Sequence, residues 1–109
     1  MMTIDNAYTL ISQNAARLDT SRLGGENIAV TMELTGSGGG VMSAALRDRK
    51  ISVRRGYVDN PDCVITLSCG DFERIINQTL SPAAAIFSGR IRVRGDLNPL
   101  LRLQEVLGF

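Results

Sequence analysis

The chain contains no histidine, which removes the residue that most often serves as a general base in enzymes. Its single lysine, Lys50, lies among other cations on a polar segment, without the desolvated pocket that Schiff-base chemistry needs. The carboxylates Asp71 and Glu73 are two positions apart on a predicted helix, so they do not face each other as a catalytic pair. We therefore expect that the domain has no catalytic residues and is not an enzyme.

Cysteine is equally scarce, since Cys63 and Cys69 are the only two in the chain. If the segment between them is extended, their Cα atoms lie ~20 Å apart, against a limit of about 7 Å for a disulfide. A CxxC motif is missing as well as histidine, so a zinc site is not expected. The sequence thus predicts free thiols in a reducing, cytoplasmic compartment, with no cofactor and no metal.

Long apolar runs are also missing. No stretch approaches the roughly 18 residues of a membrane span, and Asp5 interrupts the N-terminal segment where a secretory signal would be apolar. The ending Leu107-Gly108-Phe109 is not a peroxisomal signal of the Ser-Lys-Leu type. With 109 residues, 44% of them hydrophobic, the chain is expected to form one domain, residues 1–109, that buries roughly 65% of its unfolded surface.

The net charge of +1 gives no general attraction to nucleic acid, but the basic residues are unevenly placed. Eight of the twelve lie in two short segments: Arg47, Arg49, Lys50, Arg54 and Arg55, then Arg90, Arg92 and Arg94. One interpretation is a solvated sheet face, balanced in part by Glu33 and Asp48, and another is transient contact with an anionic membrane surface. Nucleic acid is not expected as a partner, because neither segment contains an aromatic residue on which a base could stack.

The first half of the chain changes from a helical to a strand pattern. Apolar residues recur at helical spacing over residues 3–19, which predicts an amphipathic helix packed on a sheet or facing a membrane or partner: Ile4, Tyr8, Ile11, Ala15 and Leu18. From Asn27 onward the period is two, with Ile28, Val30, Met32 and Leu34 on one face and Thr31, Glu33 and Thr35 on a wet face. Val41 to Arg49 and Lys50 to Gly56 then complete an antiparallel meander.

Residues 36–40, Gly-Ser-Gly-Gly-Gly, connect the first two predicted strands. A dinucleotide-binding loop would need a glycine or alanine at Val41 followed by a helix, and a phosphate-binding P-loop would need Gly-Lys-Ser/Thr. Neither is present, and a strand pattern follows. The loop is therefore interpreted as a flexible hairpin tip, with contact to a ligand as the alternative.

The second half contains clear helix start signals. After a strand at Cys63 to Leu67, Ser68 and Asp71 form a capping-box-like pair for a helix that carries Phe72, Ile75 and Ile76 and ends near Leu80. Ser81-Pro82 begins a second short helix closed by Gly89. Residues 90–94 alternate as a strand with arginines on one face, and Asp96 or Asn98 caps the last helix.

The last helix is apolar over more than half of its circumference, through Leu97, Leu100, Leu101, Leu103, Val106 and Leu107. Such a helix must bury more than one side. It could lie within the core, form a dimer contact, or cover a lipid cavity.

Residues 62–96 resemble the sterol carrier protein type two family, a family of small lipid carriers. The resemblance rests on Ile65-Thr66-Leu67-Ser68, Asp71-Phe72, Asn77, Leu80-Ser81-Pro82, Ala84-Ala85, Phe87-Ser88-Gly89 and Ile91-Arg92-Val93-Arg94-Gly95-Asp96. At Gln78 and Thr79 this chain departs from the Gly and Lys that are common in the family.

The resemblance implies an α+β domain in which helices pack on one face of a five-stranded mixed sheet, with an apolar cavity between them. It implies non-catalytic binding or transfer of a hydrophobic ligand, whether sterol, fatty acyl chain, phospholipid or isoprenoid lipid. The expected cavity residues are Met32 and Val53 on the floor, Phe72, Ile75, Ile76, Leu80, Ala84 and Phe87 in the walls, and Leu97, Leu100 and Leu101 as a roof. The alternative is an interaction or accessory module, a homodimer or a partner of a lipid or quinone biosynthetic enzyme, without a ligand of its own.

A lipid cavity is expected to measure about 300 Å³ or more. Left empty, an apolar void of that size would cost about 7 kcal/mol, which is comparable to the whole stability of a domain. We therefore expect the protein either to hold a ligand or to close its helices inward.

Overall fold

The computed structural model describes residues 1–17, 25 and 27–107, and residues 103–107 by their backbone alone. The elements, in order, are α1 (Ile4–Ala16), β1 (Ile28–Thr35), β2 (Gly40–Arg47), β3 (Lys50–Arg55), β4 (Cys63–Ser68), α2 (Cys69–Ile76), α3 (Pro82–Phe87), β5 (Arg92–Gly95) and α4 (Leu97–Leu107). Leu18, which was predicted to belong to the first helix, lies outside the described residues.

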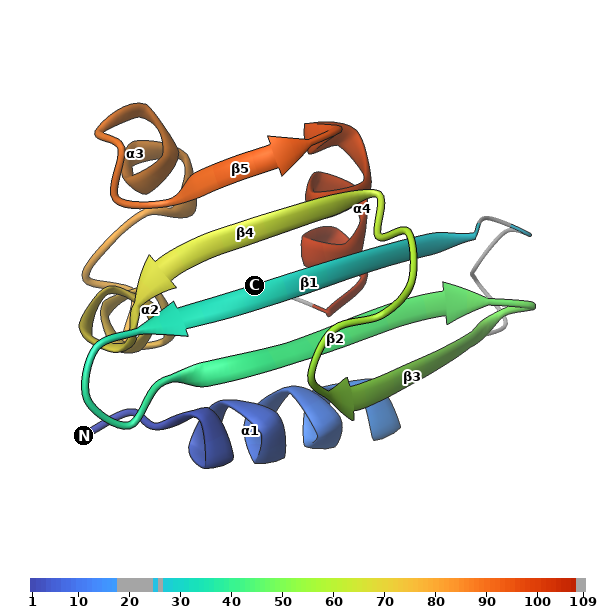
Figure 1. The fold of residues 1–109 in the computed structure, drawn as a ribbon, viewed down its shortest axis with the longest axis horizontal. Coiled ribbons are helices and arrows are strands. Elements are labelled where there is room, and N and C mark those ends of the chain that lie inside the picture. The colour runs from blue at the N-terminus through green and yellow to red at the C-terminus, as the bar shows by residue number, and fades with distance from the viewer. Residues whose placement is uncertain (18–24, 26, 108–109) are drawn as a thin grey trace.

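The strands form one mixed sheet in the order β3-β2-β1-β4-β5. β1 and β4 are parallel neighbours at the centre, and every other pairing is antiparallel. Helices α1, α2 and α4 lie behind the sheet in Figure 1, and α3 lies beside the start of β5. The predicted five-stranded mixed sheet with helices on one face is confirmed.

Helix α1 begins with a capping box in which the Thr3 hydroxyl accepts from the Asn6 N–H and the Asn6 side chain accepts from the Thr3 N–H. Ala7 and Ile11 are buried against the sheet. At the sheet edge, the Arg55 guanidinium lies 4.6 Å from the centre of the Tyr8 ring and 2.6 Å from an Asp5 carboxylate oxygen. The predicted amphipathic helix therefore packs on the sheet.

The N-terminus of α1 packs on the glycine hairpin between β1 and β2. The Ile4 N–H donates to the Gly38 carbonyl at 2.8 Å. A Cβ built on Gly38 would lie 3.1 Å from Thr3 Cγ2, and one on Gly40 would lie 3.1 Å from Ile4 side-chain carbons. The predicted hairpin turn is confirmed, and its glycines allow the helix to approach the backbone closely.

Helix α2 ends at Ile76, one turn before the predicted end near Leu80. Asn77 caps its C-terminus, and Gln78 follows with φ of 63°. This left-handed conformation favours glycine, which accounts for the Gly that is common in the family at this position. The predicted strand at Arg90 likewise begins two residues later, because the N–H groups of Arg90 and Ile91 donate to Ala85.

The outer face of the sheet is drier than the alternating pattern of β1 predicts. Thr31 is fully buried, and of the predicted wet face only Thr35 is exposed. The reason is the β3–β4 connection, residues 56–62, which crosses this face (Figure 1). Beneath it, the Thr31 and Ser43 hydroxyls are hydrogen-bonded at 2.8 Å, and Ser43 also donates to the Gly56 carbonyl.

Glu33 joins three elements of the outer face. Its carboxylate accepts from the Thr66 hydroxyl at 2.6 Å, from the Tyr57 hydroxyl at 2.5 Å and from the Arg94 guanidinium at 3.0 Å. The hydrogen bond from Thr66, followed by that from Tyr57, lowers the pKa of Glu33 below its ordinary value of 4.5. Glu33 was expected to balance basic charge on this face, and it does so as part of a defined cluster with Thr66, Tyr57 and Arg94.

Replacing Glu33 with Gln is expected to flatten the acid loss of stability. Because the folded-state pKa of Glu33 is below 4.5, its contribution is fully present above that pH and is lost as the pH falls through the lower folded value. Urea unfolding at about pH 7, 5 and 3 measures this dependence. Glu73→Gln, which removes a carboxylate that contacts none of Thr66, Tyr57 and Arg94, is the charge-matched control with which Glu33→Gln is compared. Identical profiles for the wild type and Glu33→Gln would contradict the assignment.

Candidate functional site

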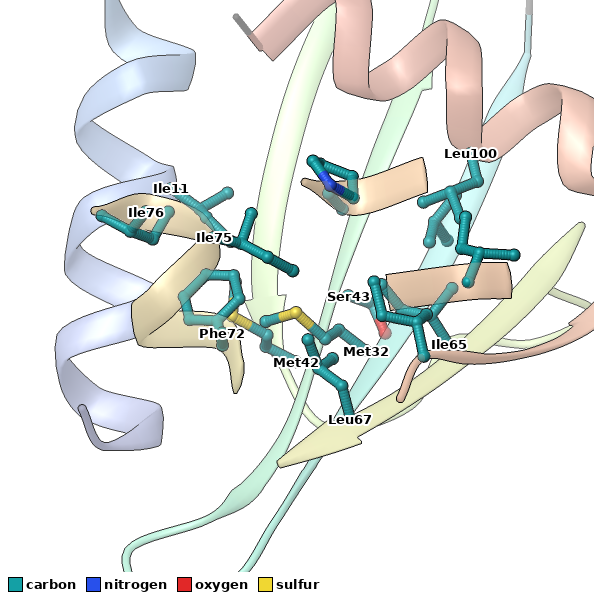
Figure 2. Close-up of a pocket in the computed structure, with 15 residues that line it drawn as sticks. Ile11, Met32, Met42, Ser43, Ile65, Leu67, Phe72, Ile75, Ile76 and Leu100 are labelled. Atoms are coloured by element: carbon teal, nitrogen blue, oxygen red, sulfur yellow. The ribbon is translucent and has the colours of Figure 1, made fainter. Parts of the chain in front are cut away.

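A cavity of about 120 Å³ lies between the inner face of the sheet and the helices. Figure 2 shows its side chains converging on one space from α1, α2, the strands and α4. Its lining comprises Ile11, Val30, Met32, Met42, Ser43, Ala44, Ile65, Leu67, Phe72, Ile75, Ile76, Pro82, Ile86, Ile91 and Leu100. Each of the four described helices contributes at least one residue, and β1, β2 and β4 supply the strand residues of the lining.

The lining is apolar because each contributing element turns its hydrophobic stripe inward. Strand residues at period two supply the floor, from Val30 and Met32 on β1 to Ile65 and Leu67 on β4. The only polar residue in the described lining is Ser43, whose hydroxyl is bonded to Thr31 and Gly56 on the outer face. The side chains of the described lining therefore present apolar surface, without charge or a free hydrogen-bonding group.

Five of the eleven predicted cavity residues line the cavity: Met32, Phe72, Ile75, Ile76 and Leu100. Phe72 lies on the buried side of α2, one turn before Ile75 and Ile76 (Figure 2). Leu100 approaches from α4 on the opposite side, and it is the one of the three predicted roof residues that lines this cavity.

Six predicted residues do not line it: Val53, Leu80, Ala84, Phe87, Leu97 and Leu101. Val53 and Leu80 are half-buried and pack against the core instead. Ala84 is exposed and Phe87 is 92% exposed, because α3 turns Ala85 and Ile86 inward. Leu97 and Leu101 are one helical turn apart and share the exposed side of α4, whereas Leu100 faces the cavity.

Most of the lining residues that the prediction missed are on the sheet and in α3. Val30 shares the predicted inward face with Met32, so the alternation of β1 contained the signal. Met42 and Ala44 were harder to assign, because small and apolar residues occupy both faces of β2 from Val41 to Ala45. Pro82 and Ile86 face inward only through the way in which α3 docks, which no local pattern specifies.

A buried carboxylate holds α2 to the segment that precedes β5. Asp71, 7% exposed, accepts from Arg74 at 2.9 Å and from Arg90 at 3.1 Å. The Ser68 hydroxyl caps the Asp71 N–H at 3.0 Å, as predicted, but no return bond from the Asp71 side chain to the cap accompanies it in the described structure. The capping role predicted for the Asp71 side chain is thus replaced by a double ion pair that orients α2.

Cys63 and Cys69 are both buried and free, which confirms that they do not form a disulfide. Burial, followed by the nearby Asp62 and Asp96, raises the pKa of the Cys63 thiol to about 11. Within residues 1–17, 25 and 27–107, no group of His, Cys, Asp and Glu is arranged to hold a metal ion. Over the same residues, no helix has the length and apolar content needed to cross a bilayer.

The cavity is smaller than the 300 Å³ expected for a lipid site. At about 24 cal/mol per Å³, an empty void of about 120 Å³ costs about 3 kcal/mol, less than half of the expected penalty. The described cavity is therefore less than half as large as the expected lipid site.

The chain matches the SCP-2 sterol transfer family over residues 8–108. This match covers nearly the whole sequence, so the chain belongs to the SCP-2 sterol transfer family, and the resemblance drawn from residues 62–96 is confirmed.

Relatives with this domain include larger proteins. Stomatin-like protein 1 of Mus musculus is 36% identical over 47 residues, which are 43% of this chain and 12% of that protein. The chain thus spans only a small part of the curated relatives it matches. Among solved structures, palmitated SCP2L2 of Aedes aegypti has a TM-score of 0.72 and 24% identity, covering 100% of this chain and 96% of that one. The sec-alkylsulfatase Pisa1 of Pseudomonas sp. has a TM-score of 0.78 and 20% identity, covering 92% of this chain and 16% of that one.

Two phenylalanine truncations test the placement of the cavity. Phe72→Ala is expected to lower the free energy of unfolding by about 3–5 kcal/mol, because it removes a buried ring and enlarges the void. Phe87→Ala removes a ring that is 92% exposed and should change it by less than about 0.5 kcal/mol. Urea unfolding of both variants measures the difference. Comparable losses would mean that α3 is docked the other way round.

Proposed function

We propose that this domain binds the hydrocarbon part of a lipid, without catalysis, in the cavity between the helices and the inner sheet face. The observation that carries the proposal is the lining itself: among its described residues, fourteen of fifteen are apolar, and the hydroxyl of the fifteenth, Ser43, is bonded to Thr31 and Gly56. A lining without charges or free hydrogen-bonding side chains suits an alkyl or polycyclic hydrocarbon. Membership of the SCP-2 sterol transfer family supports the same ligand class.

Ligand binding requires the cavity to expand from about 120 Å³. Each buried methylene contributes about 0.8 kcal/mol, so ten methylenes contribute about 8 kcal/mol, well above the cost of the existing void. The difference between these two free energies is available to displace a helix that lines the cavity. Helix α3 is suited to this movement, since Pro82 and Ile86 line the cavity while Ala83, Ala84 and Phe87 face outward. A fatty acyl chain is the ligand we favour, and the palmitated relative supports this choice.

Catalysis is not part of the proposal. No acid, base or nucleophile with a free side chain lies in the described lining, because the Ser43 hydroxyl is shared between Thr31 and Gly56. Larger relatives such as the sec-alkylsulfatase contain this fold as a minor part of the chain. We propose that the domain in such settings supplies ligand binding, and that any reaction belongs to other parts of the protein.

A second candidate function is favoured by the exposed apolar residues of α3 and α4. Phe87 is 92% exposed, Leu101 46% and Leu97 36%. These residues suit an interaction module in which the helices contact a second copy of this chain. That alternative requires a dimer whose population rises with protein concentration and falls in Phe87→Ala, and sedimentation analysis measures both.

Filling the cavity tests the site. Ala44→Leu places three further carbon atoms in the cavity and is expected to weaken binding of a fluorescent fatty acid at least tenfold, while the melting temperature of the ligand-free protein stays equal or rises. Ala84→Leu makes the same change on the exposed side of α3 and should bind like the wild type. Equal binding of the fatty acid by both variants would place the ligand outside this cavity. Loss of binding in Ala84→Leu alone would show that Ala84 lines the site, as the sequence predicted.

Bound lipid should be detectable directly. Native mass spectrometry of the purified protein, beside a mock purification, is expected to show a stoichiometric hydrophobic ligand that organic extraction releases. Removal should lower the melting temperature, because a ligand that binds only the folded state stabilises it. An unchanged melting curve after verified removal would contradict binding in the core of the fold.

A further inference from the structure

A second, polar pocket lies on the opposite face of the sheet. Its volume is about 520 Å³, and it is lined by Ser43, Ala45, Arg47, Ser52, Arg54, Val58, Asp59 and Asn60. The register of β2 and β3 places Ser43 opposite Arg54 and Ala45 opposite Ser52, so these side chains share the outer face. The crossing connection supplies Val58, Asp59 and Asn60 as a side wall (Figure 1). This pocket and the lipid cavity lie on opposite faces of the sheet and share one lining residue, Ser43.

The charges of this pocket are not used within the described structure. Among the described residues, Arg47 and Arg54 have no carboxylate within ion-pair distance, which is also true of Arg49, Lys50 and Arg92 outside the pocket. Asp59 lines the same pocket but forms no ion pair with either arginine. Two guanidinium groups and one carboxylate leave the pocket with a formal charge of +1.

We propose that this pocket binds a small organic anion that carries a phosphate or carboxylate group on a polar body. Guanidinium groups match the geometry of both anions through paired N–H donors. The volume exceeds what a phosphate ion alone would fill and lies in the range of about 300–1,000 Å³ that is typical of small-molecule sites. Ser52, Asn60 and the Asp59 carboxylate are available for hydroxyl or amino groups of the same ligand.

This site does not depend on the lipid proposal. The arginines lie on the face that helices α1, α2 and α4 leave uncovered, and the cavity variants Ala44→Leu and Ala84→Leu do not alter its lining. A failure of either site therefore leaves the other intact. The same anionic group could come from a soluble metabolite or from the headgroup of a phospholipid, and the experiment separates these two sources.

The test is a titration of the ¹⁵N-labelled protein followed by two-dimensional NMR. Inorganic phosphate and glycerol 3-phosphate are added separately, with sodium chloride at matched ionic strength as the reference. We expect saturable shifts in residues 43–47, 52–54 and 58–60. Arg47→Gln with Arg54→Gln should weaken binding at least tenfold. The matched control is Arg49→Gln with Lys50→Gln, which removes the same charge from the adjacent hairpin outside the lining and should bind within about threefold of the wild type.

Ser52→Phe provides a second variant that fills the pocket while leaving its charge unchanged, and it should also lose binding. Equal weakening in the two double variants would show that net charge alone attracts the anion and would overturn the site. Shifts that chloride reproduces, or that do not saturate, would overturn it as well. Sedimentation with phosphatidylglycerol vesicles but no response to the two soluble phosphates would replace the pocket with a membrane-contact surface.

Discussion

The parallel pairing of β1 with β4 is the constraint on which the rest of the structure depends. Because β4 runs in the same direction as β1, the chain cannot enter it through a tight turn from β3 and must cross the sheet. Residues 56–62 make that crossing over the outer face, and the Asp62 carboxylate fixes its end by accepting from the Ala29 N–H at 2.8 Å. The pairing also places α2, which follows β4 directly, at one end of the sheet (Figure 1), and Phe72, Ile75 and Ile76 of this helix line the cavity.

The two faces of the sheet therefore serve different chemistries. On the inner face, the side chains between the helices and the strands leave a cavity. Ala44 has the smallest side chain in its described lining. On the outer face, the crossing chain buries Thr31 and Ser43, whose hydroxyls satisfy each other and the Gly56 carbonyl. In the described structure, every buried polar side-chain atom has a hydrogen-bond partner. Both faces of the central strands can therefore be buried without leaving an unsatisfied polar side chain.

Sequence reasoning was most successful where the signal is local. Ser68 and Ser81-Pro82 predict two helix starts because capping depends on the three or four residues that follow. It was least successful where orientation depends on distant segments. Thr31 lies on the face that alternation marks as wet, and only the crossing of residues 56–62 buries it. Phe87 is apolar and lies within the family-like stretch, yet the docking of a six-residue helix turns it outward. For the same reason, only five of the fifteen described lining residues of the cavity were predicted.

The glycine hairpin has a practical consequence for anyone modifying this protein. Exposed turns rich in glycine and serine are the usual sites for inserted epitopes, sensor domains or new termini. Here the Gly38 carbonyl anchors the Ile4 N–H, and the backbone at Gly40 lies against the Ile4 side chain. An insertion at that turn would release the first turn of α1 and, through Ile11, loosen one wall of the cavity. The segment that looks most permissive by composition is thus an unsuitable position at which to open the chain.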